Sequence, residues 1–244
     1  MNQYRFGKHA PVKDYRTLNL KKYIKSDLPL PPVSFDSLQN LYVKLGINDP
    51  KILFPMDGND RLGDCTIAAL AHALTIYKGY IGSKQIMPET EVIKLYFKLT
   101  GGIDSGLDEL NVLNYWKDNT VYGEKILGYV SIDPKNRIHI KQAIQLFGGV
   151  YLGFQVQEKC VEQFDAGLPW TPGPLTNDGH AVFLTAYDEN GVTVLTWGNS
   201  QKGTWEWWEE CVDEAYAILP SEADKYYPGL DLEQLKIDLQ EVSN

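Results

Sequence analysis

Apolar residues recur at helical spacing through the first half of the chain, with polar or glycine-containing breaks between the runs. The clearest run begins at Cys65, is rich in alanine, and predicts a helix that continues to about Tyr80. Further helices are expected over residues 37–45, 88–99 and 108–118. The first half of the chain is therefore predicted to be mainly helical.

In the second half, the alternation typical of strands becomes the main pattern. Residues 180–187 and 192–197 flank the turn sequence Asp188-Glu-Asn-Gly191 and predict a β-hairpin. Further strands are expected at 126–132, 150–156 and 215–219, and helices at 137–147, 158–165, 204–211 and 230–242. Helices followed by strands predict an α+β fold of two lobes, a helical lobe over about 57–125 and a β lobe over about 126–244.

The first 56 residues have no regular period, and Leu28-Pro-Leu-Pro-Pro-Val33 is typical of extended chain. Because Leu28, Leu30, Val33 and Phe35 are apolar enough to dock, we expect residues 1–56 to wrap around the domain formed by residues 57–244 as a permanent scaffold. The alternative is a propeptide that occupies the active-site cleft.

Charge and hydropathy narrow the classes of partner. The net charge is −9, and no cluster of Lys and Arg suits a phosphate backbone, which argues against nucleic acid. No apolar run approaches the ~20 residues needed to span a bilayer. The start of the chain lacks the apolar stretch of a secretory signal. We therefore expect a cytoplasmic protein that binds no nucleic acid and contacts no membrane.

The three cysteines, Cys65, Cys160 and Cys211, are too few and too far apart for a disulfide scaffold or a zinc site. A reducing compartment is expected, although a single bridge between Cys160 and Cys211 stays open. Acidic turns at 57–60 and 104–108 lack the full set of spaced carboxylates of a calcium loop. We expect no cofactor and no metal.

Cys65 is the candidate nucleophile, because a polar, glycine-containing loop turns into a helix at this residue. Unpaired backbone N–H groups and the positive end of the helix dipole favour a thiolate at such a position. Its expected base is His180, which opens a strand after a long loop. Asn199 follows the second strand of the hairpin, so pairing of the two strands is expected to bring it beside His180 and fix the imidazole tautomer.

The ordered set of Cys, His and Asn resembles the papain-like cysteine peptidases. Gly63-Asp-Cys65 resembles the nucleophile motif of that family, Gly179-His-Ala-Val182 its histidine strand, and Asn199-Ser200 its Asn-Ser pair. The resemblance covers roughly residues 57–219 and points to a bacterial or bacteriophage branch with nucleophile motifs of this type. It implies a cleft between two lobes and hydrolysis of peptide or amide bonds in a peptide or protein substrate, through an acyl-thioester on Cys65.

The same resemblance implies roles for residues around the catalytic set. Asn59 stands where the family has its oxyanion-binding Gln, and Ser105-Gly106 resembles the glycine-rich wall of the substrate cleft. Gly179, next to His180, is also expected to bind the substrate. The loop 167–176 is expected to face residues 103–107 across the cleft, with Trp170 near the leaving group.

The chain also departs from the family, which keeps other functions open. Thr66 replaces the aromatic residue that usually follows the nucleophile, and Gln201 replaces the Trp that usually shields the His–Asn bond. One alternative is a pseudoenzyme or binding module, such as a component of a phage particle, in which clustered tryptophans stack on a ligand. Another is an amidase or transpeptidase that uses the same thioester chemistry with a different acceptor.

Overall fold

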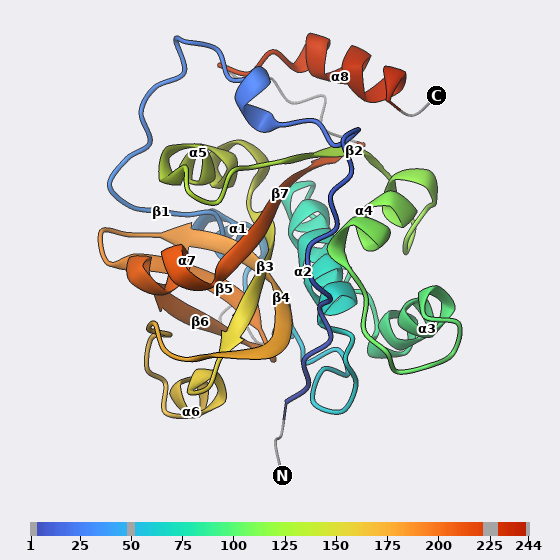
Figure 1. Ribbon diagram of the computed structural model, residues 1–244. Helices are drawn as coiled ribbons and strands as arrows, with labels where there is room; N and C mark the ends of the chain where they lie inside the picture. Colours follow the sequence, from blue (N-terminus) through green and yellow to red (C-terminus); the bar gives the residue numbers. More distant parts are fainter. Residues whose placement is uncertain (1–3, 48–51, 222–228, 243–244) are drawn as a thin grey trace.

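One antiparallel sheet runs through the middle of the protein (Figure 1). The computed structural model describes residues 4–47, 52–221 and 229–242, and within these the sheet has seven strands. Their order is β2-β7-β3-β4-β5-β6, and β1 pairs with β4. The strands are β1 Phe35–Asp36, β2 Ile126–Ser131, β3 Val150–Gln157, β4 Leu175–Tyr187, β5 Gly191–Thr196, β6 Asn199–Thr204 and β7 Val212–Pro220.

Helices cover both faces of this sheet. The longest, α2, is buried along almost its whole length and lies against β4, with α3 packed on it and α4 beside it against β2. On the other face α5 and α7 pack against the strands, as Figure 1 shows. The helices are α1 Gln39–Leu45, α2 Cys65–Tyr80, α3 Glu89–Leu99, α4 Glu109–Asp118, α5 Arg137–Phe147, α6 Cys160–Asp165, α7 Trp205–Cys211 and α8 Leu232–Glu241, with a 3-10 turn, η1, at Leu20–Lys22.

Alternation along the strands separates two hydrophobic cores. Tyr151 and Phe183 point into the core shared with α2, α3 and α4, whereas their neighbours Leu152 and Val182 point into the core shared with α5 and α7. Because successive side chains of a strand face opposite sides, one sheet can serve both cores. The α+β fold predicted from the sequence is confirmed, with helices on both sides of the sheet.

The N-terminal residues wrap the domain, but only in part through the side chains expected from the sequence. Phe35 is half-buried and packs against the core, whereas Leu30 and Val33 are largely exposed. The wrapping also uses buried Leu20 and Tyr23, and the Tyr23 hydroxyl donates a hydrogen bond of 2.6 Å to Asp238 on α8. Pattern alone could not choose among these residues, since the surface that covers each one comes from distant parts of the chain.

Two differences from the expected elements lie close to the candidate site. β4 begins at Leu175 instead of His180, and β6, which was not predicted, starts directly after a tight turn. Trp197 and Gly198 form that turn with φ values of 47° and 71°, and Thr196 then pairs with Asn199. A left-handed conformation at tryptophan is uncommon and gives no signal in the sequence pattern.

A search of the described ranges for a helix long and apolar enough to cross a bilayer finds none.

Candidate active site

Cys65 is the first residue of α2 and is buried. Asp64 precedes it at the N-cap position but makes no side-chain capping hydrogen bond. Backbone hydrogen bonds from Ala181 on β4 and from Gly7 act on the Cys65 thiol. The sulfur therefore lies where three parts of the chain meet: the start of α2, the strand that carries His180, and a segment near the N-terminus.

His180 lies on β4 beside Ala181 and is fully buried among aromatic rings. Trp197 stacks on the imidazole with ring centroids 4.6 Å apart and an angle of 25°, and the edges of Phe6 and Phe154 close two further sides. His180 Nε2 lies 2.7 Å from the hydroxyl oxygen of Thr196, whereas Nδ1 has no hydrogen-bond partner. A proton on Nε2, donated to Thr196, leaves the lone pair of Nδ1 free to accept a proton.

Burial makes the neutral forms of both groups the stable ones. It raises the pKa of the Cys65 thiol to about 12, against the smaller lowering effect of the two backbone hydrogen bonds. It also lowers the pKa of His180 to about 3. The start of α2 was expected to favour a thiolate, but desolvation outweighs the helix terminus in this state. The structure thus holds a neutral thiol near a neutral imidazole.

Asn199 does not lie beside His180, where pairing of the two hairpin strands was expected to bring it. Its side chain is exposed, and its Oδ1 accepts a hydrogen bond of 3.0 Å from the Ser200 N–H. The turn at 197–198 reverses the chain immediately after Thr196, so Thr196 meets the imidazole. Thr196 ends the second strand of the hairpin, and this position was the sequence signal that could have identified it.

Residues 4–9, which we call the N-terminal strap, run between the two lobes directly over Cys65. Lys8 N–H donates to the Gly179 carbonyl at 3.1 Å, and His9 N–H donates to the Leu107 carbonyl at 2.9 Å. Leu107 N–H in turn donates to the Gly7 carbonyl at 2.8 Å. Figure 1 shows this segment as a dark blue trace that passes in front of α2, between the sheet and α4.

Three predicted substrate-binding residues lie against the strap and form the walls of the groove that it occupies. Gly106 has a φ of 77°, and a Cβ there would lie 2.2 Å from the Gly7 carbonyl oxygen. On the opposite wall, a Cβ at Gly179 would lie 2.5 Å from the Lys8 carbonyl oxygen. Ser105 contributes its carbonyl, 2.7 Å from a ring nitrogen of His9. Only glycine allows a backbone to approach so closely, so both walls suit an extended peptide.

Asn59 is buried, and both hydrogen bonds of its Nδ2 go to backbone carbonyls. One goes to Leu62 in its own loop at 3.0 Å and the other to Arg5 in the strap at 3.1 Å. The first is a structural bond of the loop. The second holds a carbonyl of the peptide that lies in the groove, so one amide proton of Asn59 faces that peptide.

Trp170 is not part of the groove, which corrects the expectation for this residue. It is fully buried among Phe154 and Trp207, and its Nε1 donates to the Cys160 carbonyl at 3.0 Å. The wall opposite Leu107 is formed by Gly179, because Lys8 pairs with both. Trp170 was placed by its nearness to His180 in sequence, but a large apolar ring is stabilised more by the core than by an exposed loop.

The remaining cysteines and histidines do not join the site. Cys160 and Cys211 are buried free thiols, so the bridge left open by the sequence does not form. His72, further along α2, lies 3.3 Å from buried Asp57 and is a core residue of the helical lobe. Among residues 4–47, 52–221 and 229–242, no cluster of three His, Cys, Asp or Glu side chains could hold a metal ion.

The fold is that of the papain-like cysteine peptidases, as comparison with solved structures shows. Xylellain, a cysteine protease from Xylella fastidiosa, superposes with a TM-score of 0.67 at 17% identity, over 89% of this chain and 97% of that one. Procathepsin B S9 from Trypanosoma congolense gives 0.61 at 12% identity, over 89% and 87%. The cysteine protease and lectin-like domains of Cwp84 from Clostridium difficile, a surface layer associated protein, give 0.59 at 14% identity, over 91% and 58%.

No family model matches the chain, and no curated protein matches it by sequence. The structural comparison alone thus confirms the resemblance noted in the motifs, and it does so for the arrangement of the backbone. The chemistry of the site has to be argued from its own residues.

Proposed function

We propose that the protein is a cysteine peptidase whose active site is closed by its own N-terminal strap. The observation that carries the proposal is the position of the strap: a peptide lies extended between two glycine-containing walls, and its Gly7 backbone contacts the thiol of Cys65. A groove that holds one extended peptide over a cysteine beside a buried histidine suits other peptides of the same shape.

In the proposed reaction, His180 Nδ1 takes the thiol proton as sulfur attacks the scissile carbonyl carbon. The negative charge then moves to the carbonyl oxygen, where the backbone N–H of Cys65 and the Nδ2 of Asn59 are the candidate donors. Collapse of this intermediate forms a thioester and releases the amine, which takes its proton from His180. Water, deprotonated by the same nitrogen, then releases the acid.

Thr196 takes the orienting role that was expected of Asn199. Its hydroxyl oxygen can accept the proton on Nε2 and so hold the tautomer in which Nδ1 is the base. Trp197 covers this hydrogen bond, as the tryptophan after Asn-Ser was expected to do in the family. A neutral hydroxyl cannot stabilise an imidazolium as a carboxylate does, so Thr196 contributes mainly orientation.

The strap accounts for the neutral state of the catalytic pair. By covering Cys65 and His180 it removes water from both, and the pKa of the thiol is raised to about 12 as a result. Residues 4–9 thus act as the propeptide that the sequence left as an alternative, while residues 17–45 act as the scaffold. Release of the strap should restore solvent and a more reactive thiol.

The test is hydrolysis of fluorogenic peptides by the full chain and by a Gly7→Ala variant. A Cβ on residue 7 would lie 1.9 Å from the Gly63 carbonyl oxygen, so the strap has to leave the groove. We expect turnover only, or mostly, in Gly7→Ala, and none in Gly7→Ala with Cys65→Ala. Failure of a well-folded Gly7→Ala protein to cleave any peptide of a diverse library would contradict the proposal and favour the binding-module alternative. Adding an amine acceptor to an active variant separates hydrolysis from acyl transfer.

A further inference from the structure

A lysine side chain of the strap, one residue after the Gly7 that contacts the nucleophile, is buried in an acidic pocket. The side chain of Lys8 is 1% exposed. Its Nζ lies 2.8 Å from Glu214 Oε1 and 3.1 Å from Asp213, and it donates to the His9 carbonyl at 3.1 Å. Three acceptors therefore surround an ammonium group that has three protons to donate.

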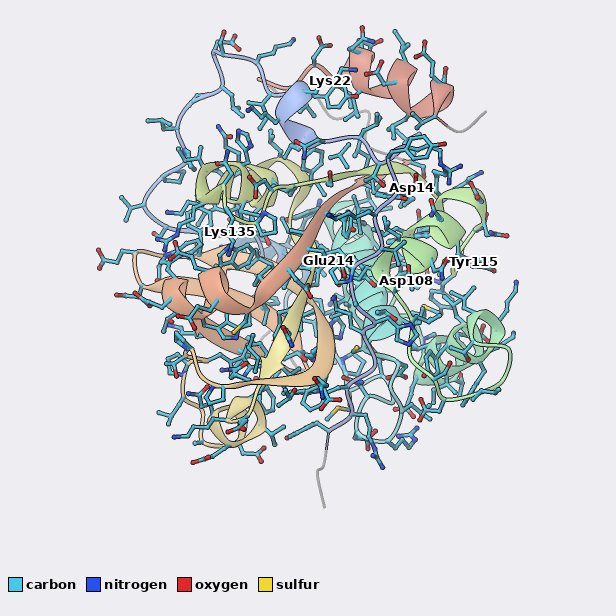
Figure 2. The ribbon with its side chains drawn as sticks, viewed as in Figure 1. Asp14, Lys22, Asp108, Tyr115, Lys135 and Glu214 are labelled. Carbon is cyan, nitrogen blue, oxygen red and sulfur yellow. The ribbon has the colours of Figure 1, made fainter. Side chains whose placement is uncertain are left out.

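The pocket is built from both sides of the groove. Glu109, in the first turn of α4, is fully buried, and neither of its carboxylate oxygens has a hydrogen-bond partner. Glu214 comes from β7, and its Oε2 accepts a hydrogen bond of 2.9 Å from Tyr216. In Figure 2 the labelled Glu214 and Asp108, the residue before Glu109, lie on either side of the N-terminal segment.

Gly153 on β3 gives the pocket room for a long side chain. A Cβ there would lie 1.8 Å from Lys8 Cε and 2.9 Å from Glu109 Oε1. The lysine stem therefore lies directly against the strand, with the carboxylate of Glu109 beside it. The missing side chain at Gly153 is what lets a four-carbon stem reach the acids.

The charges favour a cation in this pocket over any neutral group. Attraction to Glu109, Glu214 and Asp213 outweighs desolvation and raises the pKa of Lys8, so its ammonium stays charged. Burial, followed by the charge of Glu214, raises the pKa of Glu109. Buried carboxylates without a partner are costly, so removal of the ammonium leaves the pocket poorly satisfied until another cation or water enters.

We propose that this pocket, formed by Glu109, Asp213, Glu214 and Gly153, is a specificity subsite that binds the lysine side chain of an incoming peptide as it binds Lys8. The inference rests on the proposed function for its meaning in catalysis, but binding can be measured without catalysis. Lysine should be preferred to arginine, because Gly153 and the three acceptors fit a linear stem with a compact ammonium head.

The binding experiment uses full-length protein with Gly7→Ala to displace the strap and Cys65→Ala to prevent cleavage. Fluorescently labelled Tyr-Arg-Phe-Gly-Lys-His-Ala, the sequence of residues 4–10, is titrated beside versions with arginine or norleucine in place of lysine. We expect the lysine peptide to bind on the order of 10²-fold more tightly than the norleucine peptide. Equal affinities would overturn the proposal.

Two further variants assign any preference to the pocket. Glu214→Gln, added to the same background, should reduce the preference for lysine to about tenfold or less, whereas Glu189→Gln, in the exposed turn after β4, should leave it unchanged. If the preference for lysine over norleucine remained unchanged in both Glu214→Gln and Glu109→Gln, the lysine would bind outside this pocket and the assignment would be overturned.

A second route opens the groove without changing Gly7, in case that variant folds poorly. Lys8→Met removes the cation from the pocket while keeping a stem of similar length, so the strap should detach and the lysine peptide should bind to Lys8→Met, Cys65→Ala protein. Lys13→Met, at an exposed position of the same segment, is the control and should bind no peptide. Binding by the control alone would contradict the inference.

Cleavage assays distinguish failure of this inference from failure of the proposed function. Lysine-dependent binding without hydrolysis of any peptide by Gly7→Ala protein supports the subsite and contradicts the peptidase. Hydrolysis that is indifferent to lysine, together with equal binding of the three peptides, supports the peptidase and contradicts the subsite.

Discussion

Two adjacent residues of the strap meet opposite environments. Gly7 lies against Cys65, where burial favours the neutral forms of the thiol and of His180. Lys8 lies among buried Glu109 and Glu214 and the more exposed Asp213, where its ammonium faces acidic side chains. In the proposed function, the first region suppresses reactivity by removing water, and the second attaches the strap by charge. One short segment can meet both environments because the two kinds of group respond differently to burial. Burial favours the neutral form of a group without a charged partner, whereas nearby opposite charges keep a buried group charged.

The largest expected effect is on the thiol, and it tests whether burial is the suppressing factor. Gly7→Ala should raise the rate of iodoacetamide labelling of Cys65 at pH 7 by roughly 10³-fold, as the pKa falls from about 12 toward the ordinary ~8.5 of a free thiol. Because thiolate is the reactive form, labelling of the unmodified protein should keep rising with pH above 9, whereas labelling of the variant should level off. Mass mapping against Cys160 and Cys211 checks the site. An unchanged rate in a folded variant would separate the strap from the reactivity of Cys65.

Asn59 tests whether the reactive region contains a second oxyanion donor. In the Gly7→Ala background, Asn59→Ala should lower kcat on the order of 10²-fold with KM less affected. The lost bond to Leu62 will also lower the melting temperature, so turnover is measured per folded molecule. Near-normal kcat would restrict Asn59 to its structural bond in the loop.

Lys8 tests the attaching region by stability. Lys8→Met should reduce the free energy of unfolding by about 2 kcal/mol, because three acids lose their cation even though water can replace part of its effect. Lys13→Met, and removal of the exposed ion pair between Arg16 and Asp14, should each change stability by less than about 0.5 kcal/mol. Urea unfolding of the three variants gives the comparison, and equal effects would show that the strap is held by its backbone alone.

The smallest expected effect concerns orientation of the base. In the Gly7→Ala background, Thr196→Val should lower kcat about tenfold, since the imidazole loses its partner but keeps the ring of Trp197 over it. Asn199→Ala should change kcat less than twofold, because that side chain is exposed and bonded to its own neighbour. Thr196→Ser, which keeps the hydroxyl, should restore most of the rate. A larger effect of Asn199→Ala than of Thr196→Val would reverse the assignment.

The sequence by itself determined the helices, most strands, the α+β class and the resemblance to the papain-like fold. These depend on local features: the alanine-rich run after Cys65, the alternation of 180–187, and glycines at 106 and 179. It also singled out Cys65 and His180, which the structure brings to one place, since Ala181 beside His180 contacts the Cys65 thiol.

Only the tertiary structure decided which neighbours these residues meet. Thr196 replaces Asn199 beside the imidazole because a turn with Trp197 in a left-handed conformation ends the strand at Thr196 and directs Asn199 into the next strand. Trp170 lies in the core, and Lys8 meets Glu109 and Glu214 across more than a hundred residues of sequence. Burial, and with it the pKa of the thiol, depends on what covers a residue, and the segment that covers Cys65 lies almost sixty residues away in sequence. A local pattern carries no information about such a contact, whereas the free energy of burying a charge or a thiol depends on it directly.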